Sequence, residues 1–134
     1  MVSIEIAKAL REAGLRWSPT RGDHFVVMDR DMDDDVFVLS DMTIEVHDFP
    51  TGPVIGFNGT TEWALDSLDK GDALWLPSEH QLRALLGDAF VRLERSGPAY
   101  DVIVSFDGDR RTTRAGDPAD AYGLALLERL RAMA

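Results

Sequence analysis

Residues 99–133 read AYDVIVSFDGDRRTTRAGDPADAYGLALLERLRAM. The segment 100–106 is rich in β-favouring residues, and the Asp-Gly dipeptide at 107–108 is typical of a tight hairpin turn before a second strand, RRTTR. At 117–118 the order Asp-Pro is that of a helix N-cap followed by a first helical residue. This stretch therefore predicts a β-hairpin followed by a terminal helix.

The terminal helix is apolar around much of its circumference, which indicates a major element of the core. We expect Leu124, Leu127 and Leu130 to be buried, and each buried side chain contributes ~1.5 to 3 kcal/mol. Gly123 is interpreted as a mild defect in this helix, because glycine has a low helix propensity.

The N-terminal part of the chain predicts one helix and then a series of strands. Residues 4–13 have helical spacing of apolar residues, with Ser3 as N-cap and Gly14 as terminator. The β-favouring runs that follow are 24–28, 36–39, 42–47 and 54–57. The sequence FPTGP at 49–53 favours a turn before the fourth strand, because proline and glycine suit a turn better than a strand interior.

Two further helices are predicted in the middle of the chain. Residues 58–71, NGTTEWALDSLDKG, begin with capping candidates and close with Lys-Gly. After the extended ALWLP, Ser78 and Gln81 have the spacing of a capping box and open a helix that ends at Gly87. Its buried face is expected to consist of Leu82, Leu85 and Leu86. Residues 91–94 then alternate between apolar and charged types, as a strand does.

This order of elements is a helix, four strands, two helices, two or three strands and a final helix, which predicts an α+β fold. Because strands follow strands, we expect antiparallel β-meanders with helices packed on one face. A length of 134 residues with 45% hydrophobic composition is that of one ordinary domain. We therefore expect a single compact domain over residues 1–134.

Cysteine is absent, which excludes disulfides, thiolate catalysis and thiolate metal sites. The N-terminus MVSIEIAKALREAGL lacks the basic start and the uninterrupted apolar run of a signal peptide. No run approaches the ~18 apolar residues of a membrane span. We therefore expect a cytoplasmic protein that neither crosses nor binds a membrane.

The net charge is −10, from 14 basic and 24 acidic residues. A surface of that sign repels phosphate backbones, so nucleic acid is not an expected partner. Residues 1–57 carry −6 and residues 58–134 carry −4. Arg110, Arg111 and Arg114 form the one basic cluster, interpreted as the charged face of an exposed strand in preference to an anion site.

The stretch MDRDMDDDVFVLSDM at 28–42 contains the one candidate metal loop. Asp29, Asp31 and Asp33 have the alternate spacing of an EF-hand loop. The sixth position, however, is Asp34 instead of glycine, and the twelfth is Ser40 instead of glutamate. A solvated hairpin loop explains these aspartates without an ion, because aspartate side chains cap turn amides. We therefore expect neither a metal nor any other cofactor.

The histidines His24, His47 and His80 fall on separate predicted elements, without the spacing of a zinc site. His47 is followed by Asp48, and such a pair can form a general base. An exposed polar position is the preferred interpretation of His47. No serine lies in a nucleophile elbow, so acyl transfer has no visible nucleophile.

Aromatic residues supply the candidate binding positions. Trp63 and Trp75 are the first choices, with Glu62 beside Trp63 near a predicted helix start. Tryptophan is rarely buried completely, so these rings can border a partner surface, although core packing is the alternative and favoured interpretation. Trp17, Phe49 and Phe57 belong to the same aromatic set.

The segments AKALREAGLRWSPTRGDHFVVMDR, DDDVFVLSDMTIEVHDFPTGPVIGFNGTTEWALDSL and LWLPSEHQLRALLGDAF together span most of the chain. In this order they resemble a group of small bacterial, mainly actinobacterial proteins that are commonly labelled hypothetical or CpaE-like pilus assembly proteins. The resemblance implies a compact stand-alone domain. The pilus label implies an ATPase of the MinD type, which needs a glycine-rich turn with a lysine on the phosphates. No glycine here is followed by Lys-Ser or Lys-Thr, so the sequence departs from that pattern.

A second likeness concerns LPSEHQLRALL at 76–86, which is similar to the helix of small immunity and toxin-neutralising domains. We accordingly keep three hypotheses. The first is a protein-binding module that uses a surface around Trp63 and Trp75. The second is an acidic inhibitor or immunity-like domain that masks a basic partner. The third is a small enzyme that uses aspartate and histidine, with or without a metal.

Overall fold

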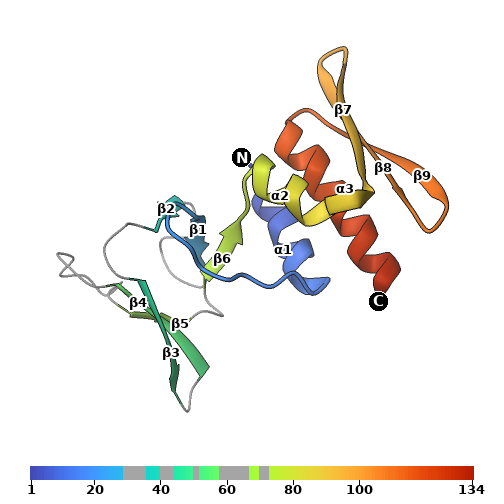
Figure 1. Ribbon diagram of the computed structural model, residues 1–134. Coiled ribbons are helices and arrows are strands. Elements are labelled where there is room, and N and C mark those ends of the chain that lie inside the picture. The colour runs from blue at the N-terminus through green and yellow to red at the C-terminus, as the bar shows by residue number, and fades with distance from the viewer. Residues whose placement is uncertain (29–35, 40–43, 50–51, 58–66, 70–72) are drawn as a thin grey trace. The chain divides into compact units, whose positions relative to one another are not determined.

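The computed structural model describes residues 1–28, 36–39, 44–49, 52–57, 67–69 and 73–134 (Figure 1). The chain divides into two compact units. Unit 1 comprises residues 1–16 and 76–134, and unit 2 comprises residues 17–75. The single domain expected from the length of the chain stays a prediction.

Helix α1, Ile4–Glu12, begins and ends as its sequence predicts. The Ser3 hydroxyl accepts the backbone N–H of Ile6 at 3.3 Å. At the other end Gly14 adopts φ 109°, a left-handed conformation that glycine reaches without steric cost. The Leu15 N–H then bonds the Leu10 carbonyl at 2.9 Å, which closes a Schellman-type end.

Helices α2, Glu79–Leu86, and α3, Pro118–Met133, also begin at the predicted caps. Ser78 and Gln81 form both hydrogen bonds of a capping box. Asp117 accepts the N–H of Ala119 at 2.8 Å, with Pro118 in the first turn. A short 3₁₀ turn, η2 at Gly87–Ala89, follows α2. Both helix predictions are therefore confirmed.

Three strands form the sheet of unit 1 in the order β7-β8-β9: β7 is Phe90–Ser96, β8 is Ala99–Phe106 and β9 is Asp109–Ala115. All neighbours are antiparallel. Asp107 and Gly108 both have positive φ, at 53° and 78°, which is the conformation of a type I′ turn. The predicted hairpin is confirmed, and the α+β fold with it.

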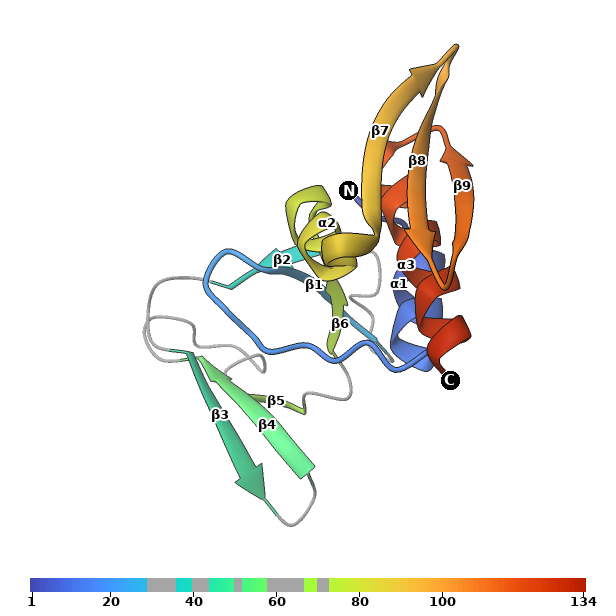
Figure 2. The same cartoon turned by 45° about the vertical axis from the view of Figure 1, so that its right-hand side comes forward.

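Helix α3 forms the centre of unit 1. It packs against β8 and β9 and against α1 and α2, as Figures 1 and 2 show. Leu127 is buried as predicted, whereas Leu124 and Leu130 are half-buried. The remaining buried side chains of α3 are mainly small or aromatic: Ala119, Ala121, Tyr122, Ala125 and Leu126.

Gly123 is a contact position and not the mild defect that the sequence suggested. A Cβ atom at this residue would lie 2.7 Å from Cγ2 of Ile6 and 3.3 Å from Cγ2 of Val2. The absence of a side chain thus lets α1 approach α3 closely. Glycine lowers the helix propensity at position 123, and the close packing of α1 against α3 compensates for this loss.

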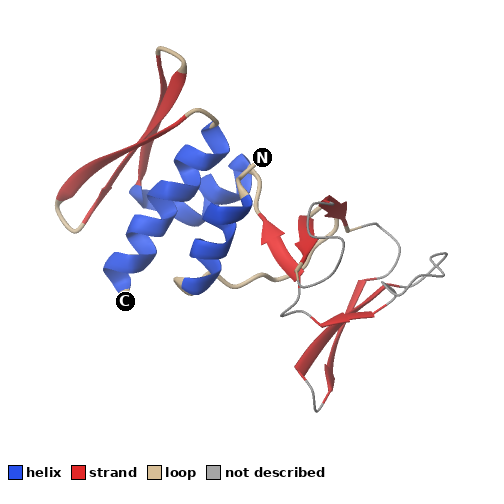
Figure 3. Ribbon diagram, turned by 180° about the vertical axis from the view of Figure 1, so that it is seen from behind, coloured by secondary structure: helices blue, strands red, loops and turns tan. Residues whose placement is uncertain are grey.

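Unit 2 contributes strands, and all helices in the described part of the chain belong to unit 1 (Figure 3). The first sheet has the order β2-β1-β6, with β1 His24–Val27, β2 Val36–Val38 and β6 Ala73–Leu76. The second has the order β3-β4-β5, with β3 Ile44–Phe49, β4 Gly52–Phe57 and β5 Ser67–Asp69. The antiparallel meander β3-β4-β5 agrees with the expected topology.

The core of the β2-β1-β6 region is an aromatic cluster. It consists of Trp17, Phe25, Val27, Leu39 and Ala73, with Phe37 and Trp75 packed against it. The Phe25 ring lies 5.6 Å from the rings of both Trp17 and Phe37. Such aromatic contacts add to the stabilisation from buried area.

Three local predictions were wrong. The first concerns the predicted helix 58–71, of which residues 67–69 form strand β5. Leu68 pairs with Ile55 of β4, and sequence periodicity does not reveal this pairing. The other residues of the predicted helix lie outside the described residues. Leu85 is 42% exposed, because it is rotated by about 100° from Leu86 on the short α2. The sequence assigns Pro53 to a turn, but this residue lies within β4, opposite Asp48 of β3. Only residues 54–56 of β4 pair with β5, so Pro53 lies outside that second pairing.

Candidate functional site

The formal charge of the chain is segregated between the two units. Unit 2 contains 13 acidic and 3 basic residues, a net charge of −10. Unit 1 contains 11 of each, a net charge of zero. The entire net charge of the protein therefore resides in 59 residues, although the two halves of the sequence taken in order look similarly acidic.

In unit 1 the charged side chains of the sheet are engaged locally. Arg114 donates two hydrogen bonds to the Asp101 carboxylate, at 2.7 and 3.0 Å, and a third to the Ser96 hydroxyl at 3.2 Å. These bonds from Arg114 lower the pKa of Asp101 below its ordinary value of 3.8, against the opposing effect of desolvation. The same contact raises the pKa of Arg114.

The basic cluster Arg110, Arg111 and Arg114 lies on β9, a strand at the edge of its sheet, as predicted. Arg111 lies over the Phe106 ring, with its guanidinium carbon 4.7 Å from the ring centroid. Arg114 is held by Asp101. Two of the three guanidinium groups thus have structural partners within the sheet, and because side chains alternate along a strand, Arg111 points to the opposite face from Arg110 and Arg114.

Strand β2 forms an apolar edge in unit 2. It is the first strand in the order β2-β1-β6, and in the described part of the chain no strand pairs with its outer side. Val36 and Val38 are 43% and 55% exposed, whereas Phe37 between them turns to the opposite face and stacks on Phe25. The edge therefore presents two valine side chains to solvent.

The backbone of β2 is also oriented for further pairing. The Leu39 N–H donates to the Asp23 carbonyl and the Leu39 carbonyl accepts from Gly22, both at 2.9 Å, so both groups of Leu39 point toward β1. Backbone groups of successive strand residues alternate in direction. Those of Val38 and Val36 accordingly point away from β1, toward the outer edge, where among the described residues no strand is paired and another strand can bind.

The two described tryptophans of unit 2 differ in how their indole N–H groups are satisfied. Trp17 is buried and donates to Oδ2 of Asp23 at 2.8 Å. Trp75 is half-buried, and its buried Nε1 has no hydrogen-bond partner among the described residues. Trp75 thus packs against the core with an indole N–H that no described residue satisfies.

The other predicted site residues are only partly placed. Trp63, Glu62 and the candidate metal-loop residues lie outside the described residues. The loop residues are Asp29, Asp31 and Asp33. His47 lies on β3 opposite Val54, and the three histidines occupy three different elements, as predicted.

Within the part of the chain that the structure describes, no group of three or more histidine, aspartate or glutamate side chains is arranged to hold a metal ion. In that same part, no helix has both the length and the apolar character needed to cross a membrane.

Comparison with known proteins gave no match: no family model, no curated protein and no solved structure is similar to this chain at a significant level. The function is therefore inferred from the chemistry of the chain itself.

Proposed function

We propose that the protein is a protein-binding module whose acidic unit 2 docks a basic, strand-forming segment of a partner protein at the free edge of β2. The observation that carries this proposal is the charge segregation, which gives unit 2 a net charge of −10 and leaves unit 1 neutral. A partner of opposite charge relieves the self-repulsion of unit 2.

Charge supplies attraction and selectivity in this proposal. A segment rich in lysine or arginine is steered toward unit 2, and an acidic segment is repelled from it. Attraction of this kind acts over about one Debye length, ~8 Å at physiological ionic strength, so binding must weaken as salt is added.

The edge of β2 supplies the position at which the partner docks. An added strand gains main-chain hydrogen bonds from the outward-pointing groups of Val36 and Val38. Its side chains alternate between two faces, so a strand with apolar residues on one face and basic residues on the other meets both needs. The two exposed valines lose contact with water in such a complex.

A second function is favoured by the same charge distribution. An acidic domain that masks a basic protein acts as an inhibitor or immunity protein, and the net charge of unit 2 suits this role. The two functions share one binding surface. They differ in whether the partner loses its own activity when it is bound.

The test is a calorimetric titration of the full chain with a short peptide of alternating lysine and valine. We expect binding that weakens steeply with salt. Val38→Ser should weaken it roughly five- to tenfold, because a newly buried valine contributes ~1 kcal/mol or more. Leu85→Ser is the matched control, since Leu85 is a similarly exposed apolar residue in unit 1.

Two further peptides separate docking from general charge attraction. A lysine-serine peptide keeps the charge and loses the apolar face, and a glutamate-valine peptide keeps the apolar face and reverses the charge. We expect weak binding of the first and none of the second. Equal binding of the lysine-valine and lysine-serine peptides, unaffected by Val38→Ser, would contradict docking at β2.

A further inference from the structure

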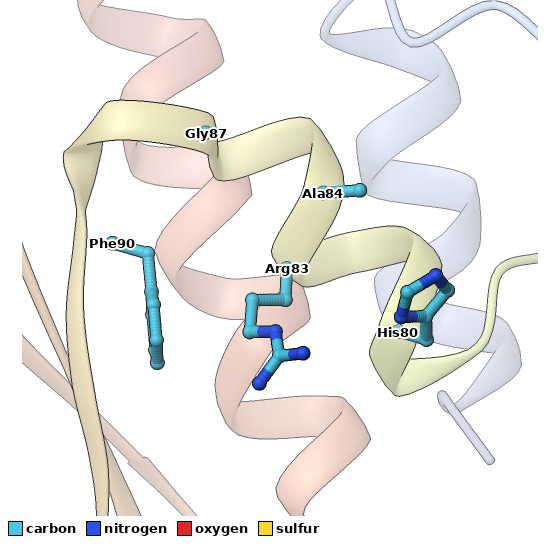
Figure 4. Close-up of a pocket in the computed structure, with 5 residues that line it drawn as sticks. All are labelled: His80, Arg83, Ala84, Gly87 and Phe90. Carbon is cyan, nitrogen blue, oxygen red and sulfur yellow. The ribbon is translucent and has the colours of Figure 1, made fainter.

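Unit 1 contains an open pocket of about 390 Å³ between α2 and the start of β7. It is lined by His80, Arg83, Ala84, Gly87 and Phe90. His80, Arg83 and Ala84 lie on one face of α2 at helical spacing, and Gly87 follows at the end of the helix. Figure 4 shows the Arg83 side chain between Phe90 and His80.

One side of the pocket is aromatic. The Phe90 ring lies 5.6 Å from the buried Tyr122 ring of α3, and this contact supports Phe90. Ala84 and Gly87 are small, and a Cβ atom added at Gly87 would meet nothing within 4 Å. The pocket beside Phe90 is thus bordered on the helix side by small residues, which leaves room for a flat group.

The other side of the pocket is cationic. The guanidinium of Arg83 lies 5.9 Å from the centroid of Phe90 and interacts with that ring. Burial raises the pKa of the Tyr122 hydroxyl. The nearby Arg83 guanidinium hydrogen-bonds to this hydroxyl, and both its charge and the hydrogen bond act to lower that pKa. These contacts fix the orientation of the guanidinium.

The donors of the pocket suit an anion. A guanidinium has five N–H donors, so contact with one phenol oxygen leaves several of them for a ligand. His80 adds a ring N–H one helical turn away, and no carboxylate belongs to the lining. Glu79, in the first turn of α2, acts on Tyr122 through its charge and must oppose an anion nearby.

We propose that this pocket binds a small planar carboxylate, with the carboxylate on Arg83 and His80 and the planar group against Phe90. A planar guanidinium pairs with a carboxylate through two parallel hydrogen bonds, which favours this anion over a spherical one. The site belongs to unit 1 and is independent of the partner proposed for unit 2.

Benzoate is the probe that matches this chemistry. In a chemical-shift titration of the full chain, benzoate should move the signals of Ala84 and Phe90. Arg83→Gln should weaken binding about tenfold or more, because it removes the charge-assisted pair. Glu79→Gln should strengthen binding by a few fold, because it removes a repulsive charge. Arg95→Gln, on exposed β7, is the control and should change nothing.

Three comparison ligands complete the experiment. Benzyl alcohol has the ring without the charge, acetate has the charge without the ring, and inorganic phosphate is not planar. We expect each to bind at least severalfold more weakly than benzoate. The proposal is overturned by equal binding of acetate or phosphate, by unchanged benzoate affinity in Arg83→Gln, or by the absence of any shift near Ala84. Tyrosine circular dichroism verifies that each variant is folded.

Discussion

The two units differ in how they use charge. In unit 1, acidic and basic residues are equal in number, and the described sheet contains the pairs Arg114–Asp101 and Arg92–Glu94. In unit 2, acidic residues outnumber basic ones by 13 to 3, so most carboxylates cannot have a basic partner in the same unit. In our proposal, partner recognition therefore belongs to unit 2 and not to unit 1.

The aromatic residues provide a separate reporter for each unit. All three tryptophans, Trp17, Trp63 and Trp75, belong to unit 2, and both tyrosines, Tyr100 and Tyr122, belong to unit 1. Tryptophan fluorescence therefore follows unit 2, whereas the tyrosine signal in near-ultraviolet circular dichroism follows unit 1. The comparison between the units can be tested without cutting the chain.

The largest effect is expected from removing residues 117–134, which deletes α3 from the centre of unit 1. Each large buried side chain that is lost, such as Tyr122 or Leu126, contributes ~1.5 to 3 kcal/mol, so unit 1 should unfold or aggregate. The measurement is the melt of the Tyr100 circular dichroism signal. A cooperative tyrosine melt in the truncated protein would show that α3 is an appendage.

A smaller effect should distinguish the two tryptophans of unit 2. Trp17→Phe removes the hydrogen bond to Oδ2 of Asp23, which costs about 1 kcal/mol because that oxygen still accepts from the backbone N–H and the hydroxyl of Thr20. Trp75→Phe removes an N–H that has no hydrogen-bond partner among the described residues, so this part of the cost should be absent. Both changes shrink the ring equally, but Trp17 is the more buried of the two, so the difference in unfolding free energy contains the hydrogen bond and the larger loss of buried area at Trp17. If Trp75→Phe is as destabilising as Trp17→Phe, the indole N–H of Trp75 has a partner.

The Asp101–Arg114 pair predicts a pH effect in unit 1. The lowered pKa of Asp101 means that its stabilising contribution is complete above the ordinary pKa of 3.8 and is lost as the pH falls through the lower, folded value. Asp101→Asn should therefore destabilise unit 1 at neutral pH, and the difference from the wild type should shrink in acid. Denaturant titrations from pH 7 downward test this, with exposed Asp88→Asn as control. A difference that does not change with pH would contradict the ion pair.

The smallest effect is expected at Asp33 and Asp34 in unit 2. If residues 29–35 are a solvated loop, replacing Asp33 and Asp34 with asparagine reduces the repulsion between neighbouring carboxylates. Each such pairwise repulsion is worth ~1 kcal/mol or less and is screened by salt. The melting temperature should be unchanged or slightly higher at low ionic strength. A melting temperature that calcium raises only in the wild type would instead identify an ion site, because a bound ion stabilises the folded state by mass action.

Local signals in the sequence predicted the described elements of unit 1 well. Helix caps at Ser3, Ser78 and Asp117, and the turn at 107–108, act over a few residues and need no knowledge of the remaining chain. The predictions failed where a segment distant in the sequence determines the local structure. Residues 67–69 are a strand because they pair with 54–56, and Gly123 is needed because α1 lies against it.

The candidate sites were harder to predict for the same reason. The run at 36–38 signalled a strand, but its position at an edge follows only from the sheet order. The charge segregation appears only when the N-terminal helix is grouped with residues 76–134. His80 and Arg83 share a helix face in the sequence, but Tyr122, which supports Phe90, comes from a helix more than thirty residues later.

The most direct test of the division between the units is amide chemical-shift mapping of the full chain with the lysine-valine peptide at low salt. We predict that the largest changes fall on β2, at Val36, Phe37 and Val38, and on its neighbour β1, while β7, β8 and β9 remain unchanged. Addition of salt should reverse these changes. Shifts centred on the β7-β8-β9 sheet, or no shifts in β2 at a saturating peptide concentration, would contradict the assignment of partner binding to unit 2.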